Sequence, residues 1–166
     1  MSGEKDYVKQ KMDTIQKALD EYEKSLGLPD RKNCLEKHEY SKYFDIKNDE
    51  IVKMDAKDCA LAQYRLAQYN FYLQRNYNYE LSRLTWAKDL LDELVVDDIT
   101  NISYIGKHEI KINIIAKQNS VVKKVLKFVS FTQQRCDRLF MLSKNIQMLW
   151  DSLDRNRMVK ISNEKY

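Results

Sequence analysis

Few residues in this sequence have the types and spacing that catalysis or metal binding needs. Cys34, Cys59 and Cys136 lie far apart and form no CxxC pair, and His38 and His108 stand at no metal-ligand spacing. No nucleophile has a recognisable base beside it, and no hydrolase motif, P-loop or dinucleotide-binding loop occurs. We therefore expect a protein that is not an enzyme and that holds no metal or other cofactor.

The charged residues suggest binding chemistry instead. Residues 1–104 carry 16 Lys and Arg against 20 Asp and Glu, and residues 105–166 carry 13 against 5, so the two parts sum to −4 and +8. An excess of one sign in one part of a chain indicates an anionic partner, or pairing with the acidic part of the same or a neighbouring chain. The acidic residues between Asp89 and Asp98 lack the glycine and spacing of a calcium loop, and we interpret them as a solvated helix end.

The basic part contains the strongest pattern in the sequence. From Ile115 to Leu153 apolar or small residues recur in alternating steps of three and four, which is a heptad repeat and is typical of a helix that packs along another helix. We expect this helix to be too long for residues 54–94 to cover, because the stripe of that segment stutters at Glu80. The sequence therefore predicts a homo-oligomer whose contacts include Val122, Val125, Val129, Leu139, Ile146 and Trp150.

The heptad positions away from that stripe are basic. Asp137 and Asp151 are the acidic exceptions, and Phe128, Phe131 and Arg135 lie beside the basic positions. A positive track with aromatic groups is typical of proteins that bind single-stranded nucleic acid without sequence preference, although aromatic residues at helical spacing more often belong to a core. The residues expected to contact phosphates are Lys117, Lys123, Lys124, Lys127, Arg138 and Lys144.

Helices are also predicted for the rest of the chain. Residues 4–25 have a helical stripe that ends at Gly27, and residues 54–94 form a long helix that Asp55 can cap. Residues 30–53 are predicted to be a connector, with a short helix over 37–44 and a polar turn over 47–50. Residues 95–101 are predicted to interrupt the helical pattern. Two interpretations of the next segment stay open: a small β-hairpin of residues 102–104 with 109–113, or the start of the last helix.

The composition agrees with a helical protein. Only 3 glycines and 1 proline occur in 166 residues, so folds that need frequent tight turns are disfavoured. We predict an all-α fold of long helices that form a helical hairpin or coiled-coil-like bundle, with residues 1–53 as an N-terminal helix and connector and residues 54–166 as the bundle domain. We expect no membrane-spanning segment and no signal peptide, and the cysteine usage suggests a reducing compartment, which we take to be the cytoplasm.

Three segments resemble phage recombination mediators of the UvsY type. They are AQYRLAQY at residues 62–69, YNYELSRLTWA at residues 77–87 and NIQMLW at residues 145–150. The resemblance implies a ring of subunits that binds single-stranded DNA and helps to load a recombinase against a single-strand-binding protein, in the cytoplasm of a bacterial host. The alternative is a structural helical oligomer, such as a virion or scaffold component, whose basic face pairs with acidic neighbours.

Overall fold

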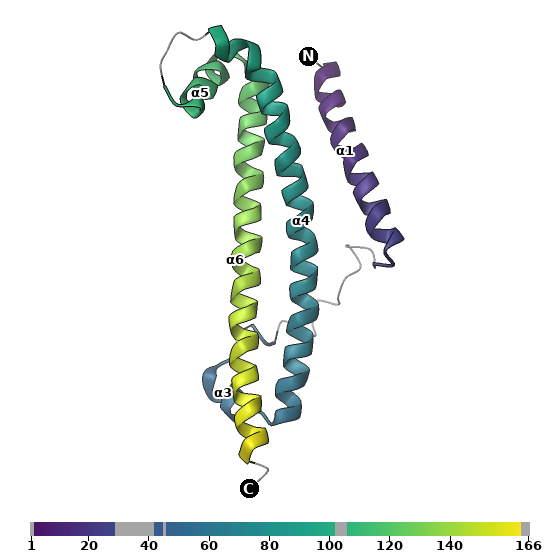
Figure 1. Cartoon of the computed structure of the whole chain (residues 1–166), viewed down its shortest axis with the longest axis vertical. Helices are drawn as coiled ribbons and strands as arrows, with labels where there is room; N and C mark the ends of the chain where they lie inside the picture. The colour runs from purple at the N-terminus through teal and green to yellow at the C-terminus, as the bar shows by residue number, and fades with distance from the viewer. Residues whose placement is uncertain (1, 29–41, 45, 102–105, 164–166) are drawn as a thin grey trace. The chain divides into compact units, whose positions relative to one another are not determined.

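The computed structural model of this chain describes residues 2–28, 42–44, 46–101 and 106–163. Within these ranges every regular element is an α-helix, and none is a strand, so the predicted all-α fold with long helices paired in a hairpin-like bundle is confirmed. Figure 1 shows the helices, which are α1 (Ser2–Ser25), α3 (Asn48–Lys53), α4 (Ala56–Asn101), α5 (His108–Gln118) and α6 (Ser120–Asn163).

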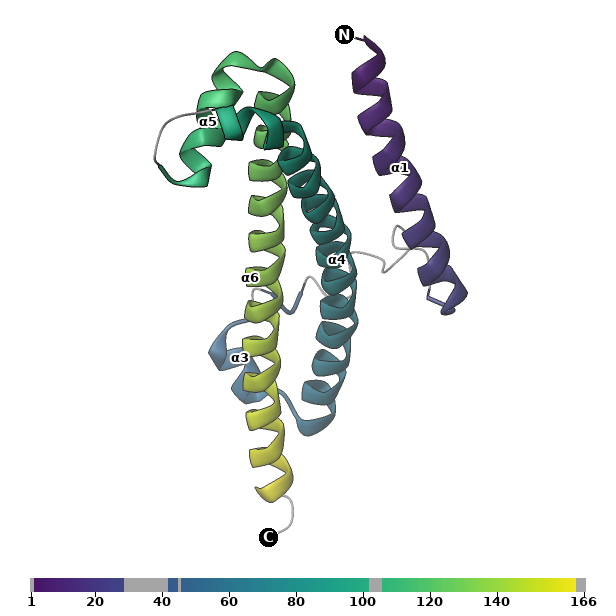
Figure 2. The same cartoon turned by 45° about the horizontal axis from the view of Figure 1, so that its top comes forward.

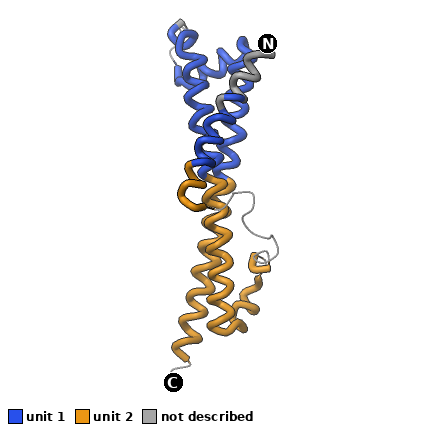
Figure 3. Tube along the Cα trace, turned by 90° about the vertical axis from the view of Figure 1, so that its right-hand side faces the viewer, with its two compact units in different colours: residues 1–21, 78–137 blue, residues 22–77, 138–166 orange. Residues whose placement is uncertain are grey.

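The chain divides into two compact units, and each unit takes part of α4 and part of α6. Unit 1 comprises residues 1–21 and 78–137, and unit 2 comprises residues 22–77 and 138–166 (Figure 3). The division therefore crosses both long helices. The predicted boundary between residues 53 and 54 stays a prediction. In each unit a segment of α4 packs along a segment of α6.

The end of α1 follows the prediction. Gly27 adopts a positive φ of 74°, which a residue without a Cβ tolerates, and its N–H donates to the carbonyl of Lys24 at 3.0 Å. The N–H of Leu28 donates to the carbonyl of Glu23 at 3.3 Å, which completes a Schellman end. The predicted short helix over residues 37–44 lies outside the described residues except for its last three positions.

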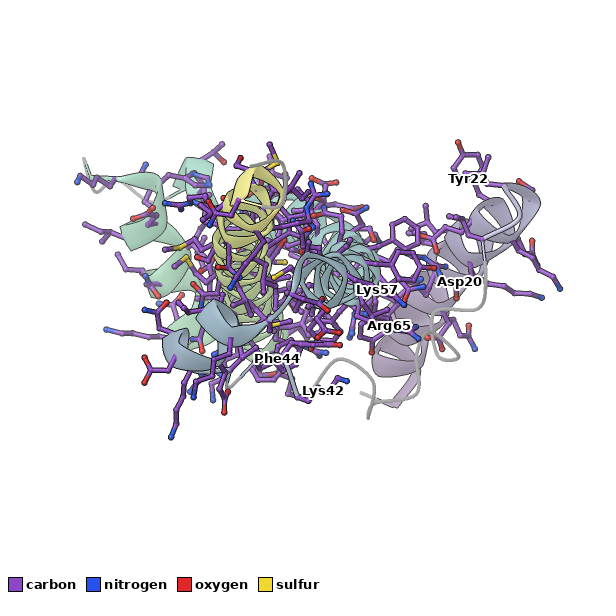
Figure 4. The ribbon with its side chains drawn as sticks, turned by 90° about the horizontal axis from the view of Figure 1, so that it is seen from below. Asp20, Tyr22, Lys42, Phe44, Lys57 and Arg65 are labelled. Carbon is purple, nitrogen blue, oxygen red and sulfur yellow. The ribbon has the colours of Figure 1, made fainter. Side chains whose placement is uncertain are left out.

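The predicted polar turn over residues 47–50 is wrong, because these residues begin α3. The N–H of Lys47 donates to the carboxylate of Glu50 at 3.0 Å, which fixes the first turn of this short helix. Ile51 is buried in unit 2, and Phe44, labelled in Figure 4, places its ring 4.9 Å from that of Tyr69 of α4. The connector therefore supplies apolar side chains to the core of unit 2.

Helix α4 begins as predicted and ends later than predicted. The carboxylate of Asp55 accepts the N–H of Asp58 at 2.6 Å, which confirms the expected cap. The predicted interruption over residues 95–101 is wrong, since α4 continues to Asn101. Val95 is fully buried and Ile99 packs on the same cluster, so burial outweighs the low helix propensity of these β-branched residues.

The β-hairpin interpretation is wrong for residues 109–113, which lie in α5; residues 102–104 lie outside the described residues. Figure 2 shows α5 beside the adjoining ends of α4 and α6 in unit 1.

The heptad segment is not one continuous helix, because α5 ends at Gln118 and α6 begins at Ser120. Between them Asn119 is extended, and its side-chain oxygen accepts the N–H groups of Val121 at 2.9 Å and Val122 at 3.3 Å. Asn119 therefore caps α6.

Each unit has its own apolar core. In unit 1, Leu91 and Val95 of α4 pack with side chains of α5 and α6. In unit 2, α4 packs with α6 and with the segment around α3. The buried residues of unit 2 are Tyr43, Ile51, Cys59, Ala62, Leu66, Leu73, Ile146 and Leu153.

Candidate functional site

The six residues predicted to mediate oligomerisation lie in these cores. Val122 and Val125 are buried in unit 1 and Ile146 in unit 2, each within the single chain. Val129, Leu139 and Trp150 are partly buried against the same clusters. The heptad stripe is therefore covered by α4 of its own chain. The expectation that part of the stripe stays uncovered, from which a homo-oligomer was predicted, is wrong. Self-association itself stays a prediction.

All six residues predicted to contact phosphates are exposed. In unit 1, Lys117 lies on α5, and Lys123, Lys124 and Lys127 lie on the first turns of α6. We call these four residues of unit 1 the basic face. In unit 2, Arg138 and Lys144 lie on the following part of α6.

In the described part of the chain no carboxylate forms an ion pair with any of these six residues. The cations of the ion pairs that occur among the described residues of unit 1 are Lys17, Arg83, Arg135 and His108. Five exposed acidic residues lie on α4 of the same unit and could have neutralised the basic face: Asp89, Asp92, Glu93, Asp97 and Asp98. The basic face therefore has the charge and the exposure that a polyanion requires.

Two phenylalanines of α6 lie near the basic face in unit 1, and they have different surroundings. Phe128 is partly buried, and the guanidinium of Arg83 from α4 lies 5.3 Å from its ring centre. Phe131 is 58% exposed. Phe131 follows Lys127 by four residues and Lys124 by seven, so the three side chains share one side of the helix.

The cation nearest to Phe131 belongs to an ion pair between α6 and α4, formed by Arg135 and the buried Glu80. Glu80 of α4 is 2% exposed, and its Oε1 forms an ion pair with Nη2 of Arg135 at 2.7 Å. Arg83 lies 3.6 Å from the same oxygen, while Oε2 is buried with no hydrogen-bond partner in the described residues. The guanidinium of Arg135 is also 5.8 Å from the ring centre of Phe131. Sequence reasoning missed this pair, because Glu80 was visible only as an interruption of the α4 stripe.

Unit 2 has a similar but separate arrangement around Lys144. Its ammonium nitrogen lies 4.8 Å from the ring centre of Phe140, which is 48% exposed. Tyr77 of α4 lies beside that phenyl ring, at 6.3 Å between ring centres. Lys144 and Phe140 thus form an exposed cation–aromatic pair in unit 2.

The cysteines do not form a reactive site in the described residues. Cys59 and Cys136 are both buried and free, and Cys34 lies outside the described residues. Burial raises the pKa of the Cys136 thiol, and the negative charge of Glu80 raises it further. A thiol with a raised pKa is a weak nucleophile, so Cys136 acts as a small apolar residue of the core.

The described residues contain neither a metal-binding cluster nor a membrane-spanning helix. No three side chains among His, Cys, Asp and Glu come close enough together there to hold a metal ion. Likewise, no helix of that part of the chain combines the length and the apolar character that crossing a membrane would require.

Comparison of this chain with protein-family models, with curated proteins and with solved structures finds no match.

Proposed function

We propose that this protein binds single-stranded DNA without sequence preference through the basic face of unit 1. The observation that carries the proposal is a set of exposed lysines that no carboxylate of the described residues neutralises. Lysines attract phosphates regardless of base. Sequence-independent binding follows from those contacts.

The biological setting of the proposal comes from the resemblance to UvsY-type mediators. Under it, the protein is a non-enzymatic accessory factor of recombination and repair that helps to load a recombinase against a single-strand-binding protein. It would act as a homo-oligomer in the cytoplasm of a bacterial cell that hosts the phage. The exposed lysines support the DNA-binding part of this proposal.

Charge reversal of the basic face tests the binding proposal. Lys123→Glu, Lys124→Glu and Lys127→Glu in one chain should abolish most binding to a labelled single strand of about 30 nucleotides. With four to six phosphate contacts the wild-type slope of log K against log salt should be roughly −3 to −4, and the triple variant should lose about 2 of that slope. Helical content and thermal midpoint should stay close to wild type, because the three side chains are exposed.

A control with the same change of charge separates a local contact from a general effect of net charge. Lys42, Lys53 and Lys57 are exposed residues of unit 2, and their reversal to Glu changes the net charge from +4 to −2, as the test triple does. The control should keep most of the affinity. Equal losses in both triples would contradict a specific basic face, and a wild-type protein without affinity for the strand at low salt would refute the proposal.

The second candidate is a structural oligomer whose basic face pairs with acidic neighbours. Its support is that unit 1 exposes both signs of charge, with the lysines on α5 and α6 and the acidic residues on α4. In this case the charge reversal should break the assembly, and the wild-type protein should bind no DNA. Native mass spectrometry and the DNA titration on the same triple variant distinguish the two candidates.

A further inference from the structure

We propose that Phe131 stacks on a nucleobase of the bound strand, so that unit 1 recognises unpaired bases as well as phosphates. This inference rests on the proposed function and goes beyond it, because lysines alone would bind single and double strands alike. It makes Phe131 the residue that gives the site its preference for single strands.

The position of Phe131 supports a role in binding rather than in the core. Its side chain is 58% exposed, whereas Phe128, three residues earlier, is partly buried beneath Arg83 of α4. Phe131 stands one helical turn after Lys127 and two turns after Lys124, which corresponds to about 6 and 10 Å along the axis. A strand whose phosphates contact those lysines would bring its bases within reach of the phenyl ring.

The ring is also held by a fixed neighbour. The guanidinium of Arg135 lies 5.8 Å from the ring centre, and the same group forms an ion pair with the buried carboxylate of Glu80 at 2.7 Å. Because Glu80 is 2% exposed and Arg135 is tied to it, the cation restricts the rotamers of Phe131 from one side. The exposed remainder of the ring is available to a base, with little ordering needed when the strand binds.

Stacking on a phenyl ring requires a base whose face is uncovered. In a duplex both faces of an internal base are covered by its neighbours, whereas a single strand can present a face at low cost. All four bases have such faces, so the contact adds affinity and selects unpaired strands without selecting a sequence.

The test compares two labelled strands of equal length and equal phosphate number, of about 30 nucleotides each. One is oligothymidine, and the other carries abasic sites at every position. Fluorescence anisotropy should show that the wild-type protein binds oligothymidine about 5- to 150-fold more tightly than the abasic strand. Phe131→Leu should lower the affinity for oligothymidine towards the abasic level and leave the abasic affinity unchanged. Phe131→Trp should retain the difference, because it keeps a larger stacking surface.

The control variant is Val96→Ala, which shortens another exposed apolar side chain of unit 1, on the acidic side of α4. It should change neither affinity, and the salt slope of Phe131→Leu should equal that of the wild type because the lysines are intact. Equal wild-type affinity for the two strands, or an equal loss on both strands in Phe131→Leu, would overturn the stacking inference alone. Absence of binding to either strand would overturn the proposed function and this inference with it.

Discussion

Replacing the buried carboxylate of Glu80 by an apolar side chain is expected to stabilise the protein. Glu80→Leu removes one close contact, the ion pair with Arg135 at 2.7 Å, and also removes Oε2, which is buried without a hydrogen-bond partner in the described residues. Arg135 can then turn to water, because its side chain is already 47% exposed. The new leucine extends the apolar stripe of α4 towards the buried Leu84.

The expected size follows from three contributions to the free energy of unfolding. We assign the close ion pair the contribution of a contact between charged groups, about 1.5–3 kcal/mol, and an unpartnered buried oxygen costs about 1–3 kcal/mol, so losing both is close to neutral. Burial of a leucine side chain adds about 1.5–3 kcal/mol. Glu80→Leu should therefore raise the free energy of unfolding by about 1–3 kcal/mol, in the range seen when buried ion pairs are replaced by apolar residues.

Urea unfolding followed by far-UV circular dichroism measures this effect, and two further variants check its cause. Arg135→Ala leaves Glu80 buried with only Arg83, at 3.6 Å, and should lower the free energy of unfolding by about 2–4 kcal/mol. The double variant Glu80→Leu with Arg135→Ala should recover most of that loss, since it also removes the buried carboxylate. A Glu80→Leu protein less stable than wild type by more than about 1 kcal/mol, or a neutral Arg135→Ala, would refute this reasoning.

Two smaller changes have equally definite outcomes. Hydrogen bonds from Gln63 and Arg157 hold the pKa of the Asp154 carboxyl below its usual range, so the carboxylate stabilises the fold above about pH 4 and the effect is lost as the pH falls through the folded pKa. Asp154→Asn should therefore lower the thermal midpoint at neutral pH and match the wild type in strong acid; a difference that persists in acid would contradict this. Asn119→Ala removes the cap of α6 and should cost about 1 kcal/mol in urea unfolding, whereas Asn119→Asp, which can still cap, should cost little; equal effects would contradict the capping role.

The sequence predicted the elements whose signals are local. The strict three–four spacing identified the buried side of α6, Asp55 identified the start of α4, and Gly27 identified the end of α1. These signals depend on neighbours within about one turn of helix, so a single sequence contains them. The exposed lysines of α6 followed from the same spacing, because positions away from the stripe are solvated.

The features that the sequence did not predict depend on contacts between segments that are far apart in the chain. The heptad pattern shows that Val122 is buried but not that the partner is α4 of the same chain. In α5 the residues Ile112, Ile115 and Ala116 share one side of a helix, yet neighbouring isoleucines also alternate as in a strand; packing in unit 1 decides between the two. In the sequence Glu80 only interrupts the apolar stripe of α4. Arg135, whose charge compensates the buried carboxylate, lies in the other long helix, α6.

Each hydrogen bond between α6 and an earlier part of the chain closes a loop when the chain folds. The number of residues between its two partners determines the conformational entropy that the closure costs. Lys88 and Gln133 in unit 1 are 45 residues apart, whereas Asn70 and Ser143 are 73 apart and Ile51 and Asn156 are 105 apart in unit 2. Loop-closure entropy grows with the logarithm of loop length, so the first contact costs about 0.7 kcal/mol less than the last. Pairing of α4 with α6 therefore costs the least entropy if it begins in unit 1. Each contact that forms then shortens the loop that the next contact has to close. During synthesis on the ribosome, the apolar side of α4 in unit 2 is made on the order of 10 s before the part of α6 that covers it. This delay is longer than the corresponding delay in unit 1.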